Sequence, residues 1–232
     1  MQRRTRRDSD DTPKPLPVPG QITALTAQAR DPERVNVFIN GDFALGLSRT
    51  VVEREALWVG QELSQENLDS LLAAETYHRA LNASLHFLSY RPRSEGEIRQ
   101  RLRKSATSAE VIDRVIQQLR DWRYVDDADF AQRWVENRSL HRPRGNRLLA
   151  QELRAKGVDS AVVDQALDDA DLDDSAQALE VARKRWSQLQ GLDAAVRDRR
   201  LIGFLQRRGF DFASIRYALD ALHAEDDDPA HE

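Results

Sequence analysis

The chain has 232 residues, a net charge of −4 and 32% charged against 6% aromatic residues, which is typical of a helix-rich protein with thin cores. It contains no cysteine, which excludes disulfides, thiolate catalysis and cysteine-based zinc sites. No apolar run is long enough to span a bilayer, and none follows the basic N-terminal residues, so neither a membrane protein nor a secretory signal is expected.

The first third of the chain predicts a tail and then a small α+β domain. Residues 1–19 mix arginine, aspartate and proline with few apolar residues, and a disordered tail is expected. In the domain, residues 20–76, three strands are predicted at 22–27, 35–39 and 43–47. Asn40 and Gly41 indicate a hairpin turn because both tolerate positive φ. Two short helices are expected after the strands, at 51–57 and 64–74.

From residue 77 onward the sequence predicts helices only, in tandem repeats. Arg91-Pro92-Arg93 recurs as Arg142-Pro143-Arg144 fifty-one positions later. The ending Leu102-Arg103-Lys104 recurs at residues 153–157, and a looser third copy of this ending lies at residues 201–209. The predicted three-helix repeats are residues 77–125, 126–173 and 174–224, followed by an acidic tail at 225–232. Their helices are expected at 77–90, 94–104, 108–122, 126–140, 144–156, 159–170, 174–189, 193–208 and 211–224. Such arrays bind long partners along a face and seldom house a catalytic pocket.

Local signals support the register of these helices. Ser94 followed by Glu97 predicts a capping box, in which each side chain accepts a hydrogen bond from the other residue's backbone. Aspartates suit the starts of four helices: Asp126, Asp159, Asp193 and Asp211. Glycines suit the position just after two helices: Gly157 and Gly209. Two tryptophans fifty-two residues apart are predicted to occupy equivalent core positions: Trp134 and Trp186.

Basic residues gather at both ends of the middle helix of each repeat. Arginines just before a helix are unfavourable for folding, since that end already carries partial positive charge, so their recurrence favours an acidic partner. A structural interpretation stays open for single residues, because Arg99 can pair with Glu95 one turn earlier. The candidate binding ridge is Arg91, Arg93, Arg99, Arg103, Lys104, Arg142, Arg144, Arg147, Arg154, Lys156, Arg207 and Arg208.

No catalytic, cofactor-binding or metal-binding constellation is predicted. The five histidines form no pair at helical spacing and lack metal-ligand spacing. No glycine-rich phosphate loop follows a strand, and nothing marks a serine or aspartate as a nucleophile. We therefore expect a protein that is not an enzyme and that has no cofactor and no metal.

Two segments carry a family resemblance. Residues 90–102 resemble the first-repeat signature of the RecX regulatory proteins, and residues 124–131 resemble the segment that opens their second repeat. Further matching positions are Arg138, Arg142, Arg144, Gly145, Leu148, Glu152, Leu153, Lys156 and Gly157. The third repeat matches least. Ser105 stands where a glycine is usual, and Arg123 stands where a glycine often precedes the tyrosine.

The resemblance implies a non-enzymatic regulator of the RecA recombinase. Such proteins lie in the groove of the RecA–single-stranded-DNA filament and suppress its ATP hydrolysis, strand exchange and co-protease activity, which modulates DNA repair and the SOS response. The implied partners are the RecA filament and the single-stranded DNA within it, and we expect a cytoplasmic monomer. Two alternatives remain, a free-standing DNA-binding helical module and an α-solenoid scaffold for other proteins.

Overall fold

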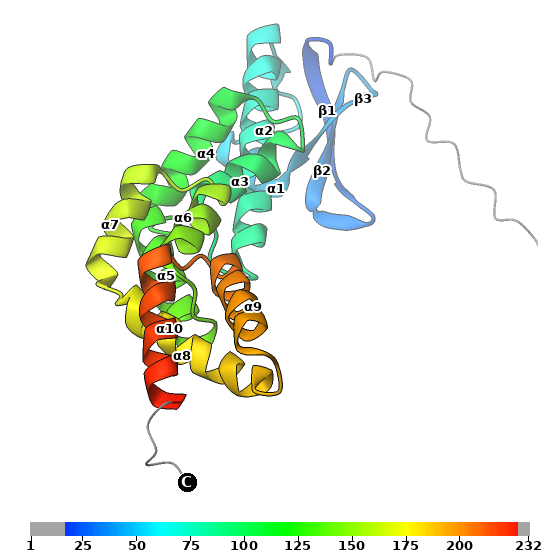
Figure 1. The fold of residues 1–232 in the computed structure, drawn as a ribbon. Coiled ribbons are helices and arrows are strands. Elements are labelled where there is room, and N and C mark those ends of the chain that lie inside the picture. The colour runs from blue at the N-terminus through cyan, green and yellow to red at the C-terminus, as the bar shows by residue number, and fades with distance from the viewer. Residues whose placement is uncertain (1–16, 227–232) are drawn as a thin grey trace, which may run out of the picture. The chain divides into compact units, whose positions relative to one another are not determined.

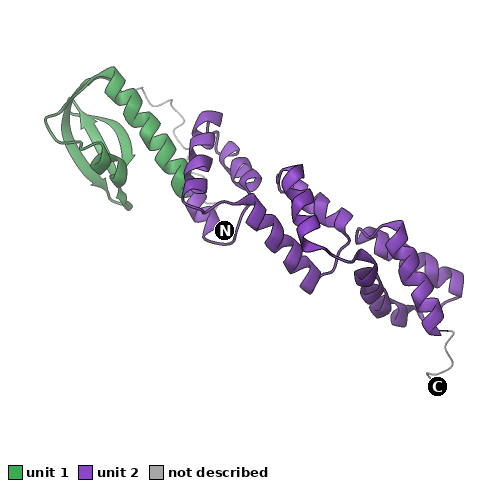
Figure 2. Cartoon of the chain, turned by 90° about the vertical axis from the view of Figure 1, so that its left-hand side faces the viewer, with its two compact units in different colours: residues 1–82 green, residues 83–232 purple. Residues whose placement is uncertain are grey.

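The structure is a computed structural model that describes residues 17–226. The chain divides into two compact units, Met1–Asn82 and Ala83–Glu232, coloured green and purple in Figure 2. Figure 1 labels helices and strands along the chain. The predicted N-terminal tail lies outside the described residues up to residue 16. The predicted acidic tail does so from residue 227.

The first unit is built on a four-stranded antiparallel sheet with strand order β3-β2-β1-β4. Its elements are β1 (Gly20–Gln28), β2 (Asp31–Ile39), β3 (Asp42–Ser48), α1 (Arg49–Arg54) and β4 (Glu62–Leu63). The hairpin prediction is confirmed, since Asn40 and Gly41 have φ values of 52° and 92° between β2 and β3. Alternate strand residues such as Ile22, Val37 and Leu47 are fully buried and form the core of this unit.

A single helix, α2 (Gln65–Leu88), follows the sheet, so the prediction of separate helices at 64–74 and 77–90 was wrong. The helix continues through the polar residues Glu75 and Thr76, because both side chains have hydrogen-bond partners. Buried Glu75 accepts hydrogen bonds from Arg34 Nη1 at 2.9 Å and from the Ser48 backbone N–H at 2.7 Å. The Thr76 hydroxyl donates to the Leu72 carbonyl at 2.7 Å.

The second unit confirms the three predicted three-helix repeats. After the end of α2, the helices are α3 (Glu95–Arg103), α4 (Ala109–Asp121), α5 (Asp127–His141), α6 (Asn146–Ala155), α7 (Ser160–Ala170), α8 (Asp174–Trp186), α9 (Ala194–Arg207) and α10 (Phe212–Asp226). A short 3₁₀ turn, η1 (Ser187–Leu189), extends α8. Ser94 forms the predicted capping box with Glu97, and Asp126, Asp159, Asp193 and Asp211 accept hydrogen bonds from backbone N–H groups that follow them.

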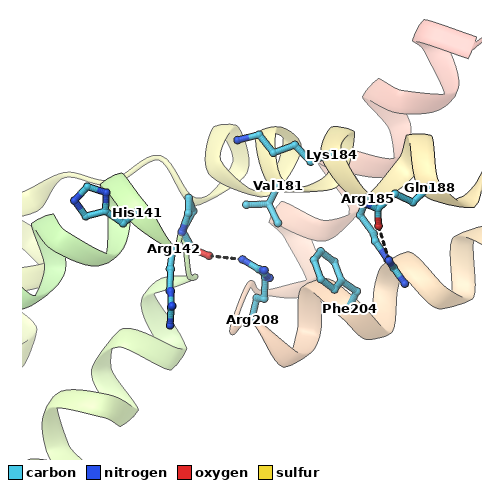
Figure 3. A pocket seen from close by; sticks show the side chains of 9 residues that line it. His141, Arg142, Val181, Lys184, Arg185, Gln188, Phe204 and Arg208 are labelled. Carbon is cyan, nitrogen blue, oxygen red and sulfur yellow. Dashed lines mark hydrogen bonds between the residues drawn. The ribbon is translucent and has the colours of Figure 1, made fainter.

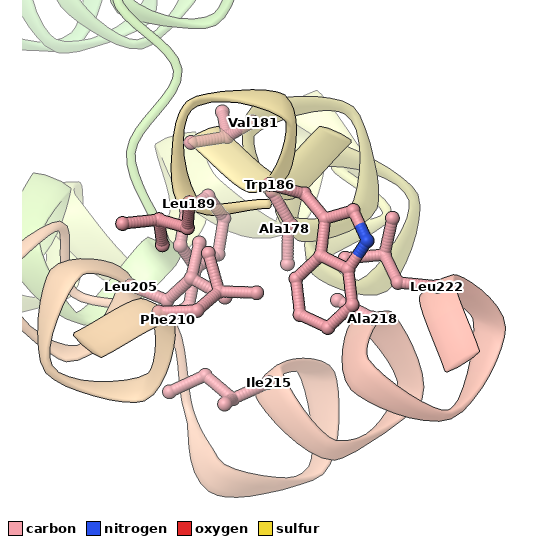
Figure 4. Packing of buried hydrophobic residues seen from close by; sticks show 11 residues of the cluster. Ala178, Val181, Trp186, Leu189, Leu205, Phe210, Ile215, Ala218 and Leu222 are labelled. Carbon is pink, nitrogen blue, oxygen red and sulfur yellow. The ribbon is translucent and has the colours of Figure 1, made fainter. Parts of the chain in front are cut away.

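The second and third repeats each bury a core of their own. In the third, Trp186 is 4% exposed and packs among side chains of α8, α9 and α10 (Figure 4). Trp134 of the second repeat packs against its core but is only half-buried. Each indole N–H donates to a carboxylate, Glu152 for Trp134 at 2.9 Å and Asp226 for Trp186 at 3.2 Å. The two positions are thus alike in bonding, while only Trp186 is a buried core residue.

Neighbouring repeats meet through the ends of their middle helices, with backbone against backbone. A Cβ added at Gly96, in the first turn of α3, would lie 2.5 Å from the carbonyl oxygen of Lys156 at the end of α6. A Cβ added at Gly145, before α6, would lie 2.5 Å from the Phe210 nitrogen beyond α9. The Gly145 N–H donates to the Arg208 carbonyl at 3.0 Å. Both junctions therefore depend on a glycine that lets two helix ends approach closely.

Arg123, which stands where a glycine often precedes the tyrosine, lies at the end of α4. Its φ is 57°, in the left-handed region, and the backbone there closes the helix through an Arg123 N–H bond to the Arg120 carbonyl at 2.8 Å. We expect Arg123→Gly to raise the free energy of unfolding by about 0.5–1 kcal/mol, because glycine adopts this φ without strain. Chemical denaturation measures this free energy of unfolding. The control Arg101→Gly, inside α3, should lower the free energy of unfolding by about 1 kcal/mol.

Candidate functional site

The structure separates the twelve predicted ridge residues into two groups. Five are exposed and form no ion pair or hydrogen bond through their side chains to any other described residue: Arg103, Lys104, Arg142, Arg147 and Arg207. The others contact carboxylates, carbonyls or aromatic rings of the protein itself: Arg91, Arg93, Arg99, Arg144, Arg154, Lys156 and Arg208. Only the first group is wholly available to a partner.

At the junction of the first and second repeats, Glu97 forms ion pairs with three basic residues of the predicted ridge. Nitrogen atoms of Arg91, Lys156 and Arg93 lie 2.7, 3.4 and 3.9 Å from its carboxylate oxygen. Arg93 also lies 3.8 Å from the centre of the Phe87 ring. Burial by itself would raise the pKa of Glu97, but the hydrogen bond from Arg91 and the charge of Lys156 hold the pKa below its usual value. Basic residues before α3 therefore have an internal role.

Two further arginines are paired within their own repeats. Arg99 contacts Glu95 at 2.8 Å, as the structural interpretation of the sequence expected, and it also contacts Asp113 of α4 at 2.5 Å. Arg154 pairs with Asp164 at 2.9 Å, although both side chains are about half exposed or more. An exposed pair of this kind contributes little to stability, so Arg154 can exchange its partner more readily than Arg99.

At the junction of the second and third repeats, four predicted residues come together. Arg142 and Arg144, before α6, and Arg207 and Arg208, at the end of α9, line one hollow of about 430 Å³. Arg144 forms an ion pair with Glu152, which also accepts from Arg138 at 3.1 Å. Burial lowers the pKa of Arg144, and the neighbouring charges of Arg138, Arg142 and Arg208 lower it further. Four arginines thus line this hollow, and among the described residues Glu152 pairs with one of them, Arg144.

A second hollow of about 380 Å³ adjoins the first and shares Arg142 and Arg208 with it. Apolar groups of Pro143, Val181 and Phe204 line it, and further polar side chains surround them: His141, Lys184, Arg185 and Gln188. Figure 3 shows Arg208 next to Phe204 on α9, with its guanidinium directed to the loop before α6.

Lys184 and Arg185 were not among the predicted ridge residues. The sequence does hold a signal for them, the basic run Arg183-Lys184-Arg185. The run lies on α8, the first helix of its repeat, and only the packing of α8 beside α9 brings it to the hollow. A search confined to the middle helices therefore overlooks it.

The same junction contains a carboxylate whose ionisation opposes folding. Asp174, in the first turn of α8, accepts a hydrogen bond from the Asn146 backbone N–H at 3.1 Å. Burial raises the pKa of Asp174, the charges of Asp211 and Asp173 act in the same direction, and the bond from Asn146 offsets part of the rise.

Asp174→Asn should therefore change how stability depends on pH. With a folded-state pKa above the unfolded value, Asp174 contributes stability at low pH that is lost as pH rises through the folded pKa. Asparagine keeps an acceptor for Asn146 but cannot ionise. We expect the free energy of unfolding of the variant, minus that of the unsubstituted protein, to increase between about pH 4 and pH 6. Urea unfolding at several pH values measures it, and a constant difference would contradict the assignment.

No group of three or more histidine, aspartate or glutamate residues within residues 17–226 is placed to hold a metal ion. No helix in the described part of the chain combines the length and apolarity needed to cross a membrane.

Comparison with family models finds matches along most of the chain. Residues 20–64 match the regulatory protein RecX N-terminal domain, and residues 80–119, 126–167 and 173–219 match the first, second and third RecX three-helix domains. These matches follow the sheet and the three repeats described above.

Known proteins of similar sequence and structure carry the same name. The chain is 33% identical over 210 residues to the regulatory protein RecX of Bacillus velezensis, spanning 90% of this chain and 80% of the relative. It is 31% identical over 208 residues to that of Bacillus subtilis, spanning 89% and 79%. A crystal structure of regulatory protein RecX superposes with a TM-score of 0.67 at 24% identity, covering 86% of this chain and 98% of that one. RecX from Lactobacillus salivarius gives 0.59 at 21% identity, covering 65% and 99%.

Proposed function

The chain belongs to the RecX family of regulatory proteins, and on that premise we propose that it regulates the RecA recombinase by binding in the groove of the RecA–single-stranded-DNA filament. It acts there as a monomer in the cytoplasm, without catalysis of its own, and inhibits ATP hydrolysis, strand exchange and co-protease activity. DNA repair and the SOS response are modulated as a result.

The observation that carries this proposal is the meeting of four arginines from two repeats around one hollow. Arginine is suited to phosphate and carboxylate because its planar guanidinium donates two parallel hydrogen bonds. A group bound among Arg142, Arg144, Arg207 and Arg208 is held by both repeats at once. Linked weak contacts of this kind raise the effective concentration of the next contact along a long partner.

The contacts within the protein narrow the proposed binding ridge. We assign direct contact with the filament to the five exposed, unpaired residues and to Arg144 and Arg208, which line the hollow. The other paired residues position the helices that carry them: Arg91, Arg93, Arg99, Arg154 and Lys156.

Co-sedimentation with three partners tests the proposal: RecA filaments assembled on single-stranded DNA, RecA alone, and the DNA alone. We expect binding to the filament to exceed binding to either component. Equal and steeply salt-dependent binding to naked DNA would instead support the DNA-binding module. Binding to none of the three would support the scaffold.

A further inference from the structure

We propose that the junction between the second and third repeats holds one nucleotide unit of a single strand, with the backbone phosphate among Arg142, Arg144, Arg207 and Arg208 and the unpaired base over Phe204 in the adjoining hollow. This inference deepens the proposed function by assigning this part of the surface to the nucleic acid of the filament and not to RecA, and it rests on that function for the identity of the strand.

The first hollow has the donors that a phosphate requires. Arg144 is fixed by Glu152, and Arg208 is fixed by the Pro143 carbonyl, to which its Nη1 donates at 3.3 Å. Arg142 and Arg207 are exposed and have no partner within the described residues, so they can turn toward a bound anion without breaking a contact. A phosphate would also relieve the repulsion that lowers the pKa of Arg144.

The second hollow favours a nucleotide over an acidic side chain. A carboxylate of a protein partner would satisfy the arginines but would leave the apolar surface of Pro143 and Phe204 uncovered. The guanidinium groups of Arg208 and Arg185 lie over the Phe204 ring, at 4.8 and 5.6 Å from its centre. An unpaired base presents an apolar face and a polar edge, and it can stack on this group of one aromatic and two guanidinium planes, with Lys184 beside it. A duplex hides its base faces by stacking and pairing, so a single strand is the form that fits.

The two hollows adjoin, since Arg142 and Arg208 line both of them, so one ligand can contact both. Their walls come from both repeats, since Arg142 and Pro143 precede α6 whereas Val181 belongs to α8 and Phe204 to α9. A nucleotide bound here therefore bridges the second and third repeats.

Fluorescence anisotropy of the full chain at low salt tests the proposal without RecA. The probes are a labelled single-stranded oligonucleotide, an abasic phosphodiester strand of equal length, a duplex, and inorganic tripolyphosphate as a competitor. We expect the abasic strand and the duplex to bind at least about fivefold more weakly than the single strand. Tripolyphosphate should compete only at far higher concentration than the unlabelled strand.

Variants separate the two hollows. The double variant Arg142→Ala/Arg207→Ala should lower the affinity for the single strand and for the abasic strand alike, by about tenfold or more. Phe204→Leu should weaken binding of the single strand more than binding of the abasic strand, which loses only the support that the Phe204 ring gives to Arg208. The control Arg133→Ala removes one exposed charge from α5, where Arg133 pairs with Asp129, and should change the affinity little. Circular dichroism confirms that each variant is folded.

Each part of the proposal can fail separately. Equal affinity for the abasic and base-bearing strands overturns the base hollow, and that comparison needs no variant. Undiminished binding by the double arginine variant overturns the phosphate hollow. If tripolyphosphate competes at a lower concentration than the unlabelled strand does, the bound phosphate does not come from nucleic acid and the proposal is overturned. Because RecA is absent from this assay, none of these results decides the filament binding that co-sedimentation tests.

Discussion

Replacing both Arg142 and Arg207 with glutamate should raise the concentration of protein needed to inhibit RecA by at least about tenfold, with no loss of folded structure. The two side chains are exposed and unpaired among the described residues, so the fold loses no contact. Each charge-assisted hydrogen bond to an anion contributes about 1.5–3 kcal/mol, and reversal of charge adds repulsion. The measurement is RecA ATP hydrolysis on single-stranded DNA, with circular dichroism of the variant alongside.

The choice of these two arginines matters because charge reversal elsewhere on the predicted ridge has a second effect. Glutamate at Arg91 or Arg144 would face Glu97 or Glu152 and would remove an ion pair at a repeat junction. Inhibition lost in those variants is therefore ambiguous between binding and folding. Arg133→Glu on α5 is the control for reversal of one exposed charge, since within the described residues Arg133 forms an ion pair with Asp129 alone. Inhibition of RecA at the concentration that the unsubstituted protein requires would show that Arg142 and Arg207 do not belong to the binding surface.

A second large effect is expected at Gly209, which ends α9 with a φ of 86°. A Cβ there would collide with the Leu148 side chain and lie 2.6 Å from the Leu148 nitrogen. Left-handed strain of about 1–2 kcal/mol and overpacking of about 1–3 kcal/mol both act against Gly209→Ala, so its free energy of unfolding should fall by about 2–4 kcal/mol.

Chemical denaturation followed by circular dichroism and by tryptophan fluorescence measures this loss, and Trp186 in the core of the third repeat contributes to the fluorescence. Gly191→Ala is the control, since an added Cβ at Gly191 meets no atom within 4 Å. Stability equal to that of the control would contradict the close packing of α6 on α9. Gly96→Ala should lower stability in the same way at the first junction, where its Cβ would meet the Lys156 carbonyl.

The repeat architecture could be predicted because its signals are local. Ser94 and Glu97 identify the start of α3 from within one helical turn, and Gly209 identifies the end of α9 by its own conformational freedom. The continuity of α2 could not be predicted in this way. Glu75 is accommodated inside the fold only because Arg34, forty-one residues earlier, reaches its carboxylate. Strand β4 was missed because its two residues, Glu62 and Leu63, carry too little pattern.

The sequence predicted which residue types form the candidate site, but not which carboxylates of the protein each basic residue contacts. The recurrence of arginine before α3 and α6 indicated candidate residues, yet Glu97 and Glu152 neutralise several of them through contacts that no spacing encodes. The meeting of Arg142 with Arg208 depends on the docking of the loop before α6 against the end of α9, where Arg208 donates to the carbonyl of Pro143, sixty-five residues earlier. The local pattern therefore identifies candidates, and tertiary packing decides which of them remain free.

The most direct measurement of the central claim is ATP hydrolysis by RecA on single-stranded DNA, titrated with this protein at far below one copy per RecA. The account predicts inhibition at substoichiometric ratios, because one molecule that bridges neighbouring RecA protomers in the groove affects many others along the filament. Unchanged hydrolysis at every ratio, with a protein shown by circular dichroism to be folded, would contradict regulation of RecA by this chain.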